Sequence, residues 1–193
     1  MCGRYSLDKE MDEILIRYKA INKANEYKPK REIYPTDEGL VVLENEEREI
    51  MYMKWGFLTS FSKRPIINAR SETIFEKATF KDSFLNRRCI IPIDSYYEWE
   101  NVDGKKIKRN IRIEGDSIFS LAGIYNIFKI GDEKHLAYVI ITTNANKKIS
   151  HIHERMPAIL SKENEDIWLN SKENNVNVLK DMLKSYDGNF IIG

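Results

Sequence analysis

Alternating apolar and polar residues run through the middle of the chain and predict a series of antiparallel strands. Asp103-Gly104 is typical of a tight hairpin turn, and a second turn is predicted at Gly131-Asp132, between the two most apolar stretches. The predicted strands span residues 39–43, 49–57, 89–93, 95–99, 106–113, 117–125 and 136–143.

Helical spacing of apolar residues flanks this strand-rich middle on both sides. In residues 8–20 it places Met11, Ile14, Leu15 and Tyr18 on one face, with acidic residues in the first turn. Further helices are predicted over residues 72–85, from a Ser161 cap to Leu169, and around residues 178–183, with a loop over residues 27–37.

Strands bracketed by helices are typical of an α+β fold. We therefore expect a single domain over residues 1–193, with a curved, barrel-like, mainly antiparallel β-sheet flanked by short helices. Its length is enough to bury a continuous core without disulfides or a structural metal. The hydrophobic fraction of 42% is that of a globular protein, and no apolar run approaches the roughly 20 residues that span a bilayer.

Charge and cysteine content restrict the kinds of partner and the cellular compartment that we expect. The net charge of +1 gives no general attraction to nucleic acid, so any phosphate-binding surface must be local. The two cysteines are too few for a disulfide framework, and the first residues lack the regions of a secretory signal. We expect a monomer without membrane contacts that is located in the cytoplasm, or in the nucleus of a eukaryote.

Cysteine at position two is the strongest chemical clue, because aminopeptidases remove methionine readily when the next side chain is small. Loss of Met1 leaves Cys2 with two adjacent nucleophiles, an α-amine with a pKa of about 8 and a thiol of about 8.5. The amine condenses with an aldehyde and the thiol closes on the imine carbon, which gives a stable thiazolidine ring. An abasic deoxyribose supplies such an aldehyde when its sugar ring opens.

The competing interpretation is that Cys2 is a small buried hydrophobic residue. Its position alone does not decide between the two, and its neighbours in the sequence are needed. Cys89 lies in an apolar run and is predicted to be an inert core residue, while Trp55 and Trp168 are assigned to packing.

Five short motifs supply that context. They are MCGRY (1–5), WGF (55–57), INARSE (67–72), YYEW (96–99) and HIHERMP (151–157). In order and approximate spacing they resemble the SOS response-associated peptidase (SRAP) domain family, which includes sensors of abasic DNA. The resemblance extends from Cys2 to about Leu169.

The resemblance implies catalytic roles for Cys2 as crosslinking nucleophile, Asn68 in the pocket, Glu98 as acid and base, and His153 as a second proton-transfer group. Each role fits the chemistry, since imine formation needs a proton shuttle and an imidazole can protonate the sugar ring oxygen. Strand alternation places Glu98 opposite the face of Tyr97 and Trp99, so that Glu98 points into a cleft while the aromatic rings pack.

The resemblance also implies DNA contacts. Arg70 in the pocket and Arg4 beside the nucleophile are expected to hold phosphates. Residues 58–64 depart from the family, whose members often carry tryptophan where this chain has Phe61. Phe61 is still expected to stack on a base, and Lys63 or Arg64 to meet further phosphates. For each cation, a solvated surface charge is the competing interpretation. His151 and His153 would also suit a metal pair, but the sequence offers no third ligand cluster, so neither a metal nor another cofactor is expected.

The leading hypothesis is capture of abasic sites in single-stranded DNA as a thiazolidine crosslink at Cys2. This would shield the lesion in the DNA damage response, and the resemblance adds lyase activity, self-reversal and removal of Met1 by the protein itself. One alternative is an N-terminal-nucleophile glutamine amidotransferase, which explains Cys2 but gives no role to Asn68, Glu98 or His153. The other is a noncovalent single-strand DNA binding module, in which Cys2 has no role.

Overall fold

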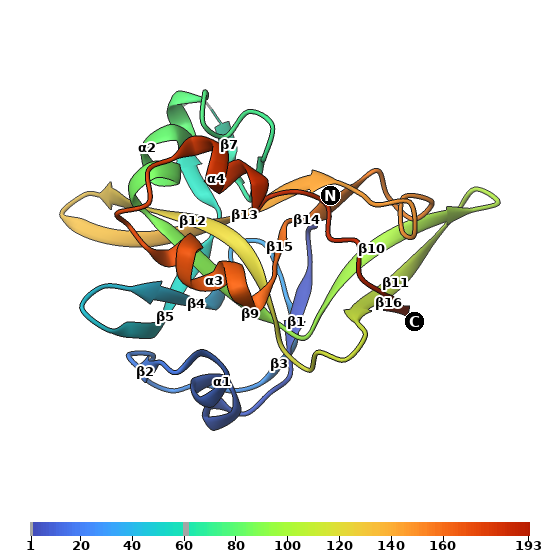
Figure 1. Ribbon diagram of the computed structural model, residues 1–193, viewed down its shortest axis with the longest axis horizontal. Coiled ribbons are helices and arrows are strands. Elements are labelled where there is room, and N and C mark those ends of the chain that lie inside the picture. The colour runs from blue at the N-terminus through green and yellow to red at the C-terminus, as the bar shows by residue number, and fades with distance from the viewer. Residues whose placement is uncertain (1, 60–61) are drawn as a thin grey trace.

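A closed five-stranded barrel forms the centre of the computed structural model, which describes residues 2–59 and 62–193 (Figure 1). The barrel consists of β4 (Glu38–Glu44), β5 (Arg48–Trp55), β9 (Arg88–Ile93), β12 (Phe119–Ile130) and β13 (Glu133–Asn144). Neighbouring strands run antiparallel in the order β13-β12-β9-β4-β5, and a parallel pairing of β5 with β13 closes the ring. Strand β9 is buried at every position, because one face points into the barrel and helices cover the other.

A second sheet of five strands stands beside the barrel, in the order β16-β11-β10-β1-β3. Its strands are β1 (Tyr5–Leu7), β3 (Lys30–Ile33), β10 (Ser95–Val102), β11 (Lys105–Ile113) and β16 (Phe190–Ile192). The predicted hairpin is confirmed, with Asp103 and Gly104 both at positive φ between β10 and β11. This hairpin projects at the right of Figure 1, while the β12–β13 hairpin lies at the left.

The remaining elements cover the barrel and its ends. The helices are α1 (Met11–Tyr18), α2 (Ala78–Asn86), α3 (Lys162–Leu169) and α4 (Val176–Asp181). The short strands are β2 (Ile21–Asn22), β6 (Phe57–Thr59), β7 (Ser62–Ile66), β8 (Asn68–Arg70), β14 (Arg155–Pro157) and β15 (Ile159–Leu160). The predicted α+β class with a barrel-like, mainly antiparallel sheet is confirmed. No helix in the described part of the chain has the length and apolar content needed to cross a membrane.

Three local predictions are wrong. The second helix begins at Ala78 instead of residue 72, because residues 71–77 form turns. The last helix ends at Asp181, so Met182 and Leu183 reach the core from outside it. The expected loop over residues 27–37 contains β3, a strand whose charged sequence gives no apolar alternation.

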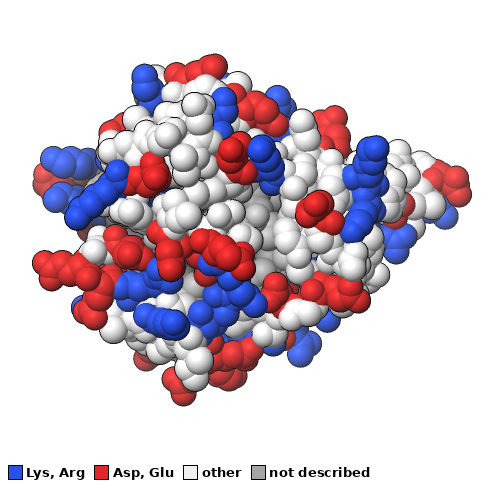
Figure 2. All heavy atoms as spheres, viewed as in Figure 1, with Lys and Arg blue, Asp and Glu red and all other residues white. Residues whose placement is uncertain are grey.

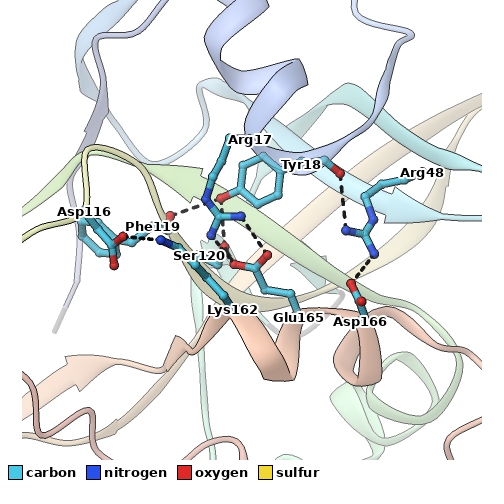
Figure 3. A network of polar contacts seen from close by, with 9 residues as sticks. All are labelled: Arg17, Tyr18, Arg48, Asp116, Phe119, Ser120, Lys162, Glu165 and Asp166. Carbon is cyan, nitrogen blue, oxygen red and sulfur yellow. Dashed lines mark hydrogen bonds and ion pairs between the residues drawn. The ribbon is translucent and has the colours of Figure 1, made fainter.

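A buried polar network fixes α1, which follows β1 directly, to the rest of the protein (Figure 3). The Arg17 guanidinium donates two hydrogen bonds to the Glu165 carboxylate on α3, at 3.0 and 2.5 Å. Ser120 on β12 donates to the same carboxylate at 2.6 Å, and the Tyr18 and Ser120 hydroxyls are 2.9 Å apart. Because a buried charge is tolerated only when it is paired and hydrogen-bonded, this network holds α1, α3 and β12 in one arrangement.

Aromatic packing joins the two sheets immediately beyond the amino terminus. The Tyr5 ring meets the edge of Trp55 at 5.2 Å, and Trp55 stacks on Tyr138 at 6.3 Å. The Tyr5 and Tyr138 hydroxyls lie 2.5 Å apart, and Trp55 Nε1 donates to the Ile67 carbonyl at 2.9 Å. These side chains are fully buried, so β1 is anchored to the barrel strand β13. The predicted packing roles of Trp55, Trp168 and Cys89 are confirmed, since all three are inaccessible to solvent.

Gly39 leaves the room that this aromatic packing needs. A Cβ atom at this position would lie 2.1 Å from the Tyr5 hydroxyl oxygen and 2.4 Å from that of Tyr138. We expect Gly39→Ala to lower the free energy of unfolding by about 2 kcal/mol, because the two hydroxyls must separate inside the core. Denaturant unfolding measures this. The same substitution at Gly193, where the nearest atoms are 3.9 Å away, should have no comparable effect, and equal losses in both variants would contradict the prediction.

Candidate active site

The pairing of β1 with β10 brings the amino terminus beside Glu98. Tyr5 is opposite Tyr96, and the Tyr97 amide donates to the Arg4 carbonyl at 2.9 Å. Continued in the same register, the chain before Arg4 runs alongside Glu98. The negative charge of Glu98 raises the pKa of the Cys2 thiol, so the two groups lie within electrostatic range of each other. Cys2 and Glu98, far apart in the sequence, therefore share one site.

Glu98 lies on the inner face of β10 and is only 3% exposed. It shares this face with buried Tyr96, whereas Tyr97 and Trp99 point to the other face, in agreement with the predicted alternation. Burial raises the pKa of the Glu98 carboxyl, and the charge of His153 acts in the opposite direction. A carboxyl shifted in this way exchanges its proton closer to neutral pH, as an acid–base group requires.

Asn68 holds the backbone of the residue that carries the thiol. It begins β8, which pairs in parallel with β13, opposite Ile140. Its side-chain amide donates to the Cys2 carbonyl at 2.8 Å, a contact that the sequence could not indicate. Within the described residues, the buried Asn68 Oδ1 has no hydrogen-bond partner. This acceptor is available to an amine or a hydroxyl donor that enters the site.

His153 completes the group of residues around Cys2. Its Nδ1 accepts the Arg155 backbone amide at 2.9 Å, so the neutral imidazole carries its proton on Nε2. His153 is half-buried, and a proton on its ring would lower the pKa of the Glu98 carboxyl, whereas His151 is exposed. Among the described residues, no group of three or more His, Cys, Asp or Glu side chains is placed to hold a metal.

The Cys2 thiol faces the interior in the chain that carries Met1. It is inaccessible to solvent, and Sγ donates a weak hydrogen bond to the Arg4 carbonyl at 3.9 Å. Burial raises the pKa of this thiol, and Glu98 raises it further. The sulfur is therefore a neutral thiol at physiological pH, and it needs a base at the moment it attacks an electrophile.

A clamp between Glu72 and Arg155 holds the two segments that carry Asn68 and His153. The nearly buried Arg155 guanidinium donates two hydrogen bonds to Glu72, at 2.5 and 2.9 Å. It also donates to Asn144 Oδ1 at 2.7 Å and to the Thr142 carbonyl at 2.6 Å. Both residues occur in the motifs noted above, but no spacing rule predicts that the two motifs meet. Their role is to position the site.

The predicted DNA-contacting cations have different environments. The Arg4 guanidinium lies 4.3 Å from the Tyr34 ring centroid and 5.0 Å from that of Trp99. Trp99 is half-buried, and its ring packs against this cation. Arg70 and Arg64 are exposed. Phe61 and the side chain of Lys63 lie outside the described residues. Figure 2 shows both signs of charge interspersed on one face, which agrees with the expectation that phosphate binding must be local.

Comparison with known proteins gives a consistent result over almost the whole chain. The model of the family described as "SOS response associated peptidase (SRAP)" matches residues 1–192. The chain is 34% identical to the abasic site processing protein YoqW of Bacillus subtilis, over 97% of this chain and 88% of that protein. It is 29% identical to the abasic site processing protein YedK of Escherichia coli, over 88% and 79% of the two chains.

Solved structures show the same fold. A crystal structure of a protein from Bacteroides thetaiotaomicron superposes with a TM-score of 0.89 at 26% identity, over 99% of this chain and 90% of the other. A second, from Bordetella bronchiseptica, has a TM-score of 0.86 at 22% identity, over 100% and 98%.

The Glu72–Arg155 clamp predicts a large loss of stability when its nearly buried arginine is removed. We expect Arg155→Met to lower the free energy of unfolding by about 2 to 3 kcal/mol. The Glu72 carboxylate, the Asn144 side chain and the Thr142 carbonyl would all lose their charged donor. Arg31→Met removes only an exposed 3.0 Å ion pair with Asp8, and should cost less than about 0.5 kcal/mol. Thermal unfolding of both variants measures the difference, and a cost at Arg155 no larger than that at Arg31 would exclude the clamp.

Burial of Glu98 predicts a pH-dependent stability difference. A carboxyl whose pKa is raised by folding contributes stability below its ordinary value of 4.5, and this contribution is lost as the pH rises through the folded value. Glu98→Gln should therefore gain stability relative to the native protein as the pH rises from 4 to 8. Melting temperatures across this range test it, with exposed Glu154→Gln as control. A difference that stays constant with pH would contradict the prediction.

Proposed function

Because the chain belongs to the SOS response associated peptidase (SRAP) family, we propose that it processes abasic sites in single-stranded DNA and captures them covalently through Cys2 once Met1 is removed. The observation that carries the proposal is the convergence of Asn68, Glu98 and His153 on Cys2. Relatives named abasic site processing proteins support the class of substrate.

The first step is condensation of the Cys2 α-amine with the aldehyde of the ring-opened sugar. His153 donates a proton to the ring oxygen as the C1–oxygen bond breaks, and Glu98 accepts the proton of the C1 hydroxyl, which becomes the aldehyde carbonyl. The amine nitrogen forms a bond to the aldehyde carbon and gives a carbinolamine. Glu98 then supplies the proton with which the hydroxyl leaves as water, and it takes back the proton that the nitrogen loses, so that an imine remains.

The second step is closure of the ring by the thiol. The sulfur forms a bond to the imine carbon, and the thiol proton passes through Glu98 to the imine nitrogen. The net change from aldehyde and aminothiol is one thiazolidine and one water. Since burial keeps the Cys2 sulfur protonated, the step depends on a base beside it, and the raised pKa of Glu98 suits both the removal and the return of the proton.

Asn68 has a positioning role in this proposal. Its amide group fixes the Cys2 carbonyl at 2.8 Å, and its open Oδ1 is an acceptor for the terminal amine or for a sugar hydroxyl. Two hydrogen bonds to one nucleophilic residue restrict the direction in which its amine approaches the aldehyde carbon.

The DNA strand is held by cations around the site. Arg4 and Arg70 bind phosphates beside the lesion, Arg64 and Lys63 bind the flanking strand, and Phe61 stacks on a base. A captured lesion is protected from strand cleavage, and Glu98 also serves reversal by protonating the leaving group of the thiazolidine. The same proposal includes lyase activity through the imine and removal of Met1 by the protein itself. It also includes a DNA-associated location.

Intact mass spectrometry tests covalent capture directly. Protein whose terminus is verified as Cys2 is incubated with single-stranded DNA that contains one abasic site. We expect one adduct, with the mass of protein plus DNA minus one water. Cys2→Ala should abolish it, while Cys89→Ala, which removes the other cysteine from the core, should retain it.

Undamaged DNA of the same sequence should give no adduct. If a free Cys2 terminus gives none with abasic DNA either, covalent capture is wrong. Ammonia release from glutamine would then indicate the amidotransferase. Retained noncovalent binding by Cys2→Ala, without any adduct from the native protein, would indicate the simple DNA-binding module.

A further inference from the structure

The Glu32 carboxylate bridges two cations on the outer face of the second sheet. Its Oε2 lies 3.0 Å from Arg4 Nη1, and its Oε1 contacts the Lys108 ammonium. The Tyr34 hydroxyl donates to Glu32 Oε2 at 2.7 Å. The three charged side chains remain between 24% and 35% exposed, so a ligand from solvent can reach all of them.

Aromatic rings fix both cations in place. Arg4 lies over the rings of Tyr34 and Trp99, and the Lys108 ammonium is 4.2 Å from the Tyr97 ring centroid. Trp99 and Lys108 are directly opposite each other in the β10–β11 pairing, which sets the spacing between the two cations. The site therefore persists without Glu32, because the strands and the rings define it.

A carboxylate held between a guanidinium and an ammonium makes the same kind of contacts as a bound phosphate. Both anions offer two oxygens to charge-assisted donors, and arginine and lysine are the usual phosphate ligands. The hydrogen bond from Lys108 holds the pKa of the Glu32 carboxyl below its ordinary value, so Glu32 is charged at neutral pH. The Glu32 carboxylate thus occupies the position between Arg4 and Lys108 where a phosphate from solution would bind.

We infer that Arg4 and Lys108 form a binding site for one phosphodiester of the DNA strand beside the captured lesion, and that Glu32 occupies this site when DNA is absent. The inference rests on the proposed function and adds Lys108 and Glu32 to it. DNA must displace the Glu32 carboxylate, and Glu32 lowers the affinity for every strand, damaged or not.

The sequence distance from Cys2 restricts where along the strand this phosphate lies. Arg4 is two residues from the nucleophile, and two residues of extended chain span at most about 7 Å. The Arg4 backbone is thus close to that of Cys2, and a phosphate on the Arg4 guanidinium lies near the lesion along the strand. Competition from Glu32 shortens the residence of undamaged strands, whereas a strand joined to Cys2 stays bound whatever the noncovalent affinity. The bridge favours retention of lesions over retention of ordinary DNA.

Noncovalent binding measures the site separately from the covalent chemistry. Fluorescence anisotropy with labelled, undamaged single-stranded DNA is carried out in a Cys2→Ala background, over a range of salt concentrations. In this background we expect Glu32→Gln to bind roughly fivefold more tightly and Lys108→Gln roughly fivefold more weakly. Lys108→Gln should also reduce the slope of log K against log salt by about 0.7, the value for one lost phosphate contact on a single strand.

Lys134→Gln is the matched control, because it removes an exposed lysine from the β12–β13 hairpin at the opposite side of the protein (Figure 1). Melting temperatures verify that each variant is folded. Unchanged or weaker binding by Glu32→Gln, or a Lys108→Gln affinity equal to that of Lys134→Gln, would overturn the inference. Since this assay contains no covalent step, a missing adduct in the mass spectrum would refute the proposed function and leave the phosphate site to be judged by its own result.

Discussion

The site depends on holding a chain terminus still. Terminal residues are usually poorly ordered unless a sheet or the core fixes them. Here β1 is fixed on both sides, by the backbone pairing with β10 and by the buried Tyr5 hydroxyl against that of Tyr138. Asn68 adds a third constraint from the barrel side, through the Cys2 carbonyl. Without these contacts the second residue would have no defined distance to any acid–base group.

The second requirement is a carboxyl kept away from water. Burial of Glu98 costs folding free energy, and a protein would gain stability by replacing it. The same burial moves its pKa in the direction that proton transfer needs. Glu165 and Glu72 are held by arginines and stabilise the fold. Buried and half-buried carboxylates in one chain thus serve different ends, since burial raises the pKa of Glu98 whereas an arginine lowers that of Glu72.

Much of the architecture could be predicted from the sequence. Long apolar strands such as β12 and β13 and the turn at Asp103-Gly104 have strong local signals, and the motifs point to the site residues. The closure of the barrel could not be predicted, because the parallel pairing of β5 with β13 joins distant segments without a local pattern. The contacts of Glu32 with Arg4 and Lys108 could not be predicted for a similar reason. It lies on a charged strand, and its partners come from β11 and from the residue before β1.

The joining of distant segments also determines the order in which the site forms during folding. Cys2 is synthesised long before β10 and β13, which hold it. Contacts between such distant segments carry a large loop-closure entropy and form slowly. During synthesis, Cys2 therefore exists for a time without Glu98 beside it and without the hydrogen bond from Asn68. Under the proposed function, the arrangement that captures a DNA lesion therefore exists only once the barrel has closed.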